Sequence, residues 1–310
     1  MKLKGPVEAQ SDFPELLSQT GCMDSGDVKK PGPGLLKYEV NAPFWSDGAK
    51  KERFMALPDG AQITVREDGR FNFPKGSVLV KQFRIDGALV ETRLMMKHED
   101  GDWGTYLYEW NDAQSDATFL RAEKTKTLPN GQKWLLPGRA DCLTCHTSAA
   151  NRALGLEVAQ LNKTMDYTST LRRSNQISTL RSIGILADEG TPIKDLPSLV
   201  DPFGDATLDK RARAYLHTNC ASCHLAGNDL RVDFDFRFTA NLSDFCNHEV
   251  LKPLGLSDPK VIKPGDAANS MALYRSGRRD ADSMPPMGSA LIDMRGINLL
   301  EKWVGQLSCP

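Results

Sequence analysis

The sequence lacks several features that would point directly to a function. Its formal net charge is −1 over 310 residues, so it has no basic surplus with which to contact nucleic-acid phosphates. No apolar run reaches the roughly 18 residues expected of a membrane-spanning helix. We find no catalytic triad, phosphate-binding loop or carboxylate pair to support hydrolytic chemistry. These absences argue against nucleic-acid, membrane-spanning and hydrolytic functions, and they leave the oligomeric state open.

Histidine and cysteine are scarce, with 5 and 7 residues, but half of them gather in two short segments. Cys142-Leu143-Thr144-Cys145-His146 and Cys220-Ala221-Ser222-Cys223-His224 share the spacing C-x-x-C-H, the signature of c-type haem attachment. Thiols three residues apart can bond the two vinyl groups of one haem, and the adjacent histidine can bind its iron. We predict two covalently attached haems, with Cys142, Cys145, Cys220 and Cys223 as thioether residues and His146 and His224 as iron ligands.

Other uses of C-x-x-C explain the pattern less well. A dithiol redox motif is expected after a strand in a βαβ unit, and this sequence shows no such pattern. Four cysteines can bind one zinc ion, but the two pairs are much farther apart in sequence than those of a compact zinc ribbon. Neither alternative requires a histidine after each pair.

The haem motifs predict a location outside the cytoplasm, because haem is normally attached to C-x-x-C-H there. The first residues, Met1-Lys2-Leu3-Lys4-Gly5-Pro6, are basic but have no apolar stretch after them. We therefore expect that a secretory signal has been removed or replaced. The predicted location is the periplasm or another exported compartment.

Three cysteines lie outside the haem motifs: Cys22, Cys246 and Cys309. An oxidising compartment favours a disulfide between two of them, and the third is then left over. The spacing does not choose among the three possible pairs. Gln19-Thr20-Gly21-Cys22 also has a faint likeness to a lipoprotein box, although no apolar segment precedes it.

The first half of the chain predicts β structure after an extended lead-in over 1–34 with one short helical piece at 14–18. Runs rich in β-branched and aromatic residues alternate with turn signals such as Asp86-Gly87, which favours a hairpin. The expected strands are 61–66, 77–85, 88–97, 104–111 and 117–122. We predict a β-sandwich or jelly-roll-like domain over 35–136.

Helical patterns replace strands from Asp141 onward, so the predicted fold class is a multidomain α+β protein. Helices are expected at 150–162, 174–183, 205–218 and 293–307. We assign 137–200 to a first haem segment and 201–310 to a second haem domain. The helix before Cys220, the long loop and the final helix follow the order of a class I cytochrome c.

The resemblance to class I cytochrome c covers roughly residues 205–308. Ser283-Met284-Pro285-Pro286-Met287-Gly288 is similar to the segment that carries the distal methionine in such domains. The resemblance implies that Met284 is the distal ligand of the second haem, with Met287 as its competitor. A pair of core methionines is the alternative.

A wider resemblance spans nearly the whole chain. Its residues are Asn41–Arg53, Val90–Leu94, Tyr108–Asn111 and Asp141–His146, in that order. The chain resembles a largely uncharacterised bacterial family of exported dihaem c-type proteins with a β domain before two haem motifs. This resemblance implies haem, export and the domain order, but no particular substrate.

The distal ligand of the first haem is open at this stage. His98 is the favoured candidate, because it ends a β run beside the Asp100-Gly101 turn. Met165 is the next, and Met95, Met96 and His248 are further ones. An iron without a sixth protein ligand is also possible. The arginines at 172–173 and 275–279 are candidates to pair with haem propionates.

We expect electron transfer, in which two haems form a relay to a redox partner protein of unknown identity. His/Met ligation would close the second iron to substrates. One alternative is a peroxidase-like redox enzyme with an open first iron. Another is a binding module in which the β domain recognises a ligand and the haems relay electrons. The sequence leaves the question of enzymatic activity open.

Overall fold

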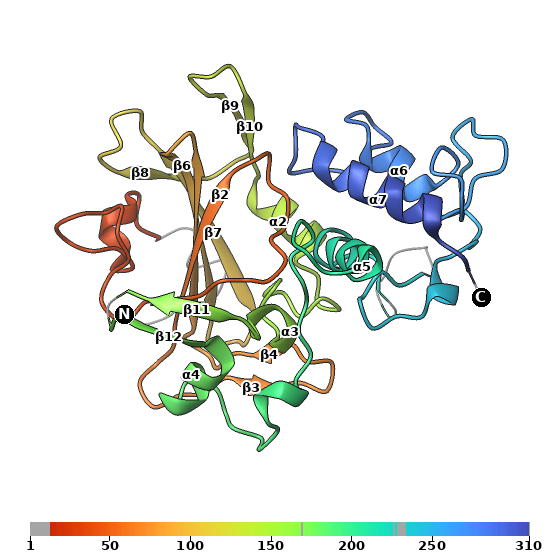
Figure 1. Cartoon of the computed structure of the whole chain (residues 1–310). Helices are drawn as coiled ribbons and strands as arrows, with labels where there is room; N and C mark the ends of the chain where they lie inside the picture. Colours follow the sequence, from red (N-terminus) through yellow and green to blue (C-terminus); the bar gives the residue numbers. More distant parts are fainter. Residues whose placement is uncertain (1–12, 169, 226, 228–233, 310) are drawn as a thin grey trace.

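The computed structural model describes residues 13–168, 170–225, 227 and 234–309. Figure 1 shows a large antiparallel sheet on one side and a helical part around α5, α6 and α7 on the other. The short helix α2 (Arg139–Cys145) lies between these two parts. The fold is therefore of the α+β type, as predicted. No helix within the described ranges is long and apolar enough to cross a membrane.

The main sheet has six antiparallel strands in the order β1-β2-β5-β6-β7-β8. Its strands are β1 (Leu36–Lys37), β2 (Lys50–Ala56), β5 (Val78–Ile85), β6 (Ala88–Lys97), β7 (Trp103–Trp110) and β8 (Ala117–Leu120). The predicted hairpin at Asp86-Gly87 is present, because Ile85 pairs with Ala88. Both turn residues have positive φ, 49° and 86°, as a tight two-residue hairpin turn requires.

Side chains alternate between the two faces of this sheet. The first face carries Phe54, Val80, Leu94 and Tyr106, which pack in one core with residues of the lead-in. The 3-10 helix η1 (Leu17–Thr20) contributes Leu17 to this core and confirms a short helical piece close to the expected position. The first twelve residues of the predicted lead-in over 1–34 lie outside the described residues.

The second face has apolar clusters at both ends. At one end, Met55 and Leu79 pack against α3 (Val158–Leu161) and α4 (Gln176–Ser182), with β3 (Thr64–Val65) and β4 (Phe71–Asn72) alongside. At the other end, Phe83 packs against Trp134 of the hairpin formed by β9 (Lys124–Thr127) and β10 (Lys133–Leu136). The strip between these clusters faces the first C-x-x-C-H segment.

The structure has one large sheet in place of the two facing sheets of the predicted β-sandwich or jelly-roll-like domain. Among the described residues, the other sheets are the two-stranded β3–β4, β9–β10 and β11–β12, where β11 is Thr164–Tyr167 and β12 is Arg172–Asn175. One end of the second face is covered mainly by residues that follow position 150 in the sequence. We had assigned these residues to the first haem segment. The strand patterns show which faces are apolar, but they do not reveal what covers them.

The helix expected at 150–162 is mostly a loop. Only Val158–Leu161 is helical, and Asn151, Arg152 and Gly155 have positive φ of 59°, 57° and 74°. This loop turns the Arg152 carbonyl back toward His146, with which it forms a hydrogen bond. The tertiary contact therefore overrides a helical apolar pattern.

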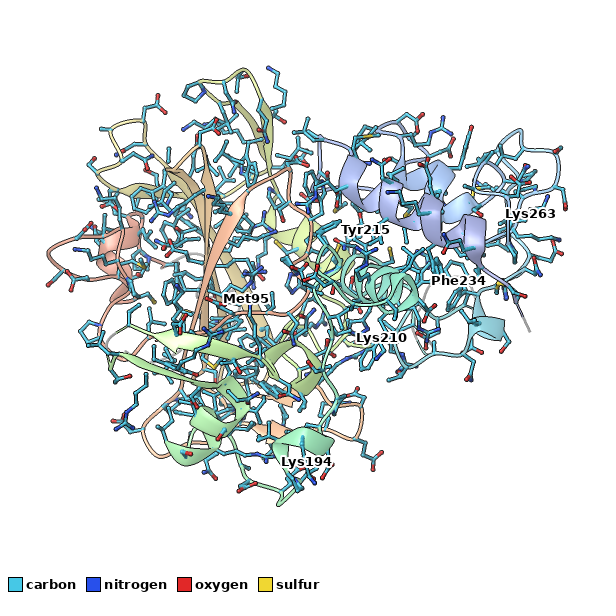
Figure 2. The ribbon with its side chains drawn as sticks, viewed as in Figure 1. Met95, Lys194, Lys210, Tyr215, Phe234 and Lys263 are labelled. Atoms are coloured by element: carbon cyan, nitrogen blue, oxygen red, sulfur yellow. A yellow bond between two sulfur atoms is a disulfide. The ribbon has the colours of Figure 1, made fainter. Side chains whose placement is uncertain are left out.

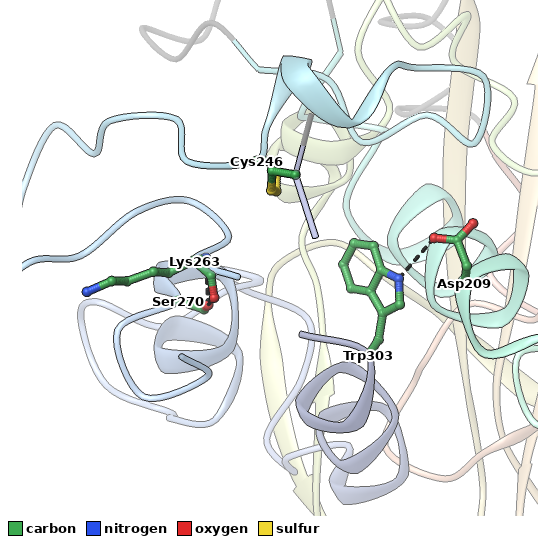
Figure 3. The surroundings of a disulfide bond; sticks show 6 residues. Asp209, Cys246, Lys263, Ser270 and Trp303 are labelled. Carbon is green, nitrogen blue, oxygen red and sulfur yellow. Dashed lines mark hydrogen bonds between the residues drawn. A yellow bond between two sulfur atoms is a disulfide. The ribbon is translucent and has the colours of Figure 1, made fainter. Parts of the chain in front are cut away.

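The helical part is built around the packing of α5 (Leu208–Asn219) against α7 (Met294–Gln306), both close to their predicted ranges. The Tyr215 hydroxyl donates to Asp293 at 3.1 Å. Trp303 Nε1 donates to Asp209 at 3.0 Å (Figure 3). The remaining elements are α6 (Met271–Ser276), η2 (Ile193–Asp195) and η3 (Leu242–Asp244). A disulfide joins Cys246 to Cys309, which selects one of the three pairings left open.

Candidate functional site

The first C-x-x-C-H segment lies on α2 and at its end. The Asp141 carboxylate accepts a hydrogen bond from the Gly138 backbone N–H at 2.8 Å and stabilises the first turn. Cys142 and Cys145 then lie three residues apart on one side of the helix. His146 ends the helix, where its backbone N–H donates to the Cys142 carbonyl at 2.9 Å.

The ring of His146 is oriented by the loop that follows it. Its Nδ1 lies 2.5 Å from the Arg152 carbonyl, and a carbonyl can only accept, so Nδ1 carries the proton. The lone pair is then on Nε2. Burial, and after it the Lys81 charge, lowers the pKa of His146 to about 4, so the ring is neutral at pH 7. Metal-ligating histidines commonly show this arrangement, in which one ring nitrogen of a neutral imidazole donates a hydrogen bond to a carbonyl and the other is left to bind the metal.

These three residues line a cavity of about 170 Å³ between α2, the second face of the sheet and α5. Its wall includes Phe44, Lys81, Arg93, Glu157, His217 and Met287. His217 Nε2 lies 2.7 Å from the Glu157 carboxylate, and its Nδ1 accepts from the Phe238 N–H at 3.3 Å. His217 is thus held in a defined orientation on the cavity wall.

The second C-x-x-C-H segment begins at the end of α5. The Cys220 N–H donates to the Leu216 carbonyl at 2.8 Å, and the His224 N–H donates to the Cys220 carbonyl at 2.9 Å, which makes a compact turn. The His224 ring stacks on Phe234 at 4.6 Å between ring centroids and meets the edge of Phe236 at 5.8 Å. Figure 2 places Phe234 in the helical part, together with Tyr215 of α5. Burial lowers the pKa of His224 to about 4, with a further contribution from Arg275.

The second motif lines a larger cavity of about 550 Å³, within the rough range of 300–1,000 Å³ typical of cofactor sites. Met284, the predicted distal ligand, lines the same cavity as His224. The Met284 N–H donates to the Arg275 carbonyl at 2.9 Å, which fixes the methionine loop to α6. The rest of the wall is largely apolar and aromatic: Phe234, Phe236, Val261, Met271 and Ile297. This cavity suits a large, flat, apolar group.

The two motifs are in contact with each other. Cys223 Sγ lies 3.6 Å from the Thr144 carbonyl oxygen, and Cys145 lines both cavities. The proximity of the two thiols lowers the pKa of Cys223 and raises that of Cys145. Phe44, from the loop before β2, also contributes to both cavities. The two cavities therefore share a wall made by the motifs themselves.

Several predicted site residues are brought together, and others are not. Each cysteine pair lies in a cavity with its histidine, and Met284 lines the cavity of the second motif. Arg275 and Arg279 line the second cavity, whereas Arg172 and Arg173 are exposed on β12. Cys22 is a free thiol and lines neither cavity.

His98 requires a correction as the predicted distal ligand of the first haem. Its Nε2 lies 2.8 Å from the Tyr106 hydroxyl, and its side chain is 1% exposed on the first face of the sheet. The first cavity opens on the second face, so His98 lies on the wrong side of the sheet. The strand period of two explains the error, because His98 continues the Leu94–Met96 side of β6.

The other candidates for that role also lie elsewhere. Met165 and Met95 line neither cavity, Met96 is in the first-face core, and His248 lines the second cavity. Met287, considered only as a competitor of Met284, lines the first cavity instead. The two methionines of one loop are thus divided between the two sites.

Sequence reasoning missed His217 and a row of cations on the second face: Lys51, Arg53, Lys81 and Arg93. A signal for the cations was present in the sequence. Leu79, Lys81 and Phe83 share one side of β5, and a lysine between two buried apolar residues departs from the strand pattern.

Comparisons of the chain with protein-family models, with curated proteins and with solved structures give no match. Within the described part of the chain, no three His, Cys, Asp or Glu side chains converge as ligands of a single ion.

Proposed function

We propose that this chain is an exported dihaem c-type cytochrome that transfers electrons to a redox partner protein. In this proposal, one haem is bonded to Cys142 and Cys145 with His146 as its iron ligand. The other is bonded to Cys220 and Cys223 with His224. The helical part around the second motif would then correspond to a class I cytochrome c domain, and the chain to the bacterial family that it resembles.

The observation that carries the proposal is the placement of His224 and Met284 on the walls of one cavity. A haem bound there would supply a one-electron redox couple. The residues of the chain would hold it: the thiols fix its position, His224 presents a neutral imidazole, and Met284 presents a thioether. Phe234 and Phe236 hold the His224 ring and exclude water from it, which affects the redox potential.

The contact between the two motifs supports a relay. Because Cys223 Sγ lies 3.6 Å from the Thr144 carbonyl oxygen and Cys145 lines both cavities, groups attached to the two motifs would be close neighbours. Transfer between them would need no large movement of the chain. The loop before β2 touches both sites through Phe44 and connects the β part to the relay.

The decisive experiment is the mass and spectrum of the protein matured in a host that attaches c-type haem. We expect the mass of the polypeptide plus two haems, and a low-spin spectrum for the second haem. The Cys220→Ser/Cys223→Ser variant should lose one haem, and Cys142→Ser/Cys145→Ser the other. A mature protein with the bare polypeptide mass would contradict the proposal.

One observation favours a second candidate function, a redox enzyme at the first site. The first cavity carries the His217–Glu157 pair, which can supply a proton, as well as several cations. A high-spin ferric component in the spectrum, altered by added peroxide, would favour this alternative. Two low-spin haems would favour the electron carrier.

A further inference from the structure

Three cations form a row across the centre of the main sheet. Arg53 of β2 is the direct partner of Lys81 of β5, and Lys81 is the direct partner of Arg93 of β6. Lys51, two residues before Arg53, lies on the same face of β2. All four line the first cavity. Since neighbouring strands are about 4.8 Å apart, the row of three spans about 10 Å.

This row of like charges lowers the stability of the fold unless an anion compensates its positive charge. Like charges directly opposite each other on adjacent strands repel. The row lies between two apolar clusters, one with Met55 and Leu79 and the other with Phe83 and Trp134. Such surroundings penalise charged groups. Accordingly, burial lowers the pKa of Lys81 to about 7, and it lowers that of Lys51 well below its usual value.

Only Arg93 has an ion-pair partner among these four cations within the described residues. Glu91 binds it through two hydrogen bonds of 2.6 and 3.1 Å, and it also accepts from Trp134 Nε1 at 3.1 Å. No described carboxylate lies within 4.0 Å of the charged atoms of Lys51, Arg53 or Lys81. The charge of the row is therefore largely uncompensated.

The other acidic side chains of the cavity wall are engaged elsewhere. Asp47 accepts from Ser289 and from the backbone N–H groups of Ala290 and Leu291. Asp141 is bound to the Gly138 N–H, and Glu157 to His217.

The cations also differ in the hydrogen bonds that their charged groups donate to the protein. Lys51 donates to the Phe44 carbonyl and, at 3.1 Å, to the Ser46 hydroxyl. Arg53 donates to the Lys51 carbonyl at 3.4 Å. The side chain of Lys81 makes no hydrogen bond to any residue that the structure describes, so its donors are available to a group in the cavity.

We propose that Lys51, Arg53, Lys81 and Arg93 form a binding site for a carboxylate or a similar small oxoanion in the first cavity. Such a ligand has two possible sources. One is the pair of propionates of a haem on Cys142 and Cys145, and this source rests on the proposed function. The other is a free anion of the same chemistry, which does not require haem.

The test uses Lys81→Met, which removes the charge and keeps the length of the side chain. Lys51→Met provides a second variant from the same row. Lys50→Met is the matched control, because Lys50 is exposed on the opposite face of the same strand. Thermal unfolding of each variant shows whether it is folded before binding is measured.

The first measurement is the pH dependence of the haem midpoint potentials in the mature protein. If propionates occupy the row, the cations keep them ionised, so the potential of one haem should be nearly constant between pH 5 and pH 8. In Lys81→Met the propionate pKa should rise into this range, and a decrease of potential with pH should appear. Lys50→Met should behave like the wild type.

The second measurement is calorimetric titration with inorganic phosphate. If the row serves a free anion, phosphate should bind to the wild type and to Lys50→Met, and at least tenfold more weakly to Lys81→Met. If no variant changes either the pH dependence or phosphate binding, the proposed site is wrong. Should mass spectrometry show no haem, the proposed function fails, and the phosphate titration of that same preparation still decides the anion site.

Discussion

The carboxylate of Asp47 accepts a hydrogen bond from the Ser289 hydroxyl at 2.5 Å. The backbone N–H groups of Ala290 and Leu291 donate to the same carboxylate at 2.7 and 3.1 Å. These contacts join the loop before β2 to the loop that carries Met284 and Met287. Asp47 is 3% exposed, so water cannot easily replace it as the acceptor. The β part therefore holds the methionine loop that the two cavities share.

We expect Asp47→Ala to lower the free energy of unfolding by about 1–3 kcal/mol, because three donors lose a buried acceptor. Chemical denaturation measures this change. Asp59→Ala is the control, since Asp59 is exposed in a turn and should change stability by less than about 0.5 kcal/mol. Equal stabilities of the two variants would show that the Asp47 contacts contribute nothing.

Met284→Ala and Met287→Ala should affect different haems, if the proposed function holds. Met284 lines the second cavity with His224, whereas Met287 lines the first. Loss of the thioether ligand in Met284→Ala should remove the weak sulfur-to-iron absorption and lower one potential by on the order of 0.1 V. Spectra and redox titrations of both variants check this. Persistence of the absorption in Met284→Ala would reassign the ligand.

Gly296→Ala should destabilise the protein although alanine favours helices. A Cβ at this position would lie 2.1 Å from the Tyr215 hydroxyl, so α5 and α7 would have to move apart. We expect a loss of about 1–3 kcal/mol in the free energy of unfolding.

Gly305→Ala in the same helix is the matched control for this prediction. A Cβ there has no heavy atom within 4 Å, so the change should stabilise by about 0.5–1 kcal/mol. Thermal melts of the two variants should shift in opposite directions. Shifts in the same direction would mean that the contact of Tyr215 with Gly296 does not limit the packing of these helices.

The Cys246–Cys309 disulfide should stabilise the helical part by about 2–4 kcal/mol, because it closes a long loop. Denaturation of the Cys246→Ser/Cys309→Ser variant measures this contribution. Adding a thiol reductant to the wild type should give a similar loss. Cys22→Ala should retain the reductant-dependent loss, since Cys22 is a free thiol. A reductant effect that disappears in Cys22→Ala would indicate a different pairing.

Local sequence patterns were sufficient to predict the structure wherever residues close in sequence are also close in space. The β5–β6 hairpin follows from Asp86-Gly87, whose positive φ values suit these residue types. The helix before Cys220 and the final helix follow from their apolar spacing. The two C-x-x-C-H segments needed only their own spacing, because both thiols and the histidine of each motif lie within five residues.

The face of the sheet on which a side chain lies depends on the strand register and on the segments that pack against that face. His98 directly follows β6, a strand that was predicted correctly, yet it lies on the opposite face of the sheet from the first motif. The segment at 150–162 has a helical pattern, but the Arg152–His146 contact and the packing on Met55 and Leu79 make most of it a loop. Single-sequence patterns do not contain these tertiary contacts.

The sequence by itself determined the chemistry that this protein can offer: two thiol pairs, each with a histidine, and a loop with two methionines. Only the tertiary structure decided which of these groups lie next to one another. It divided Met284 and Met287 between two cavities, brought the two C-x-x-C-H segments into contact, and aligned Arg53, Lys81 and Arg93 across three strands. The physical reason is that these neighbours come from distant segments, which meet only when apolar faces are buried together.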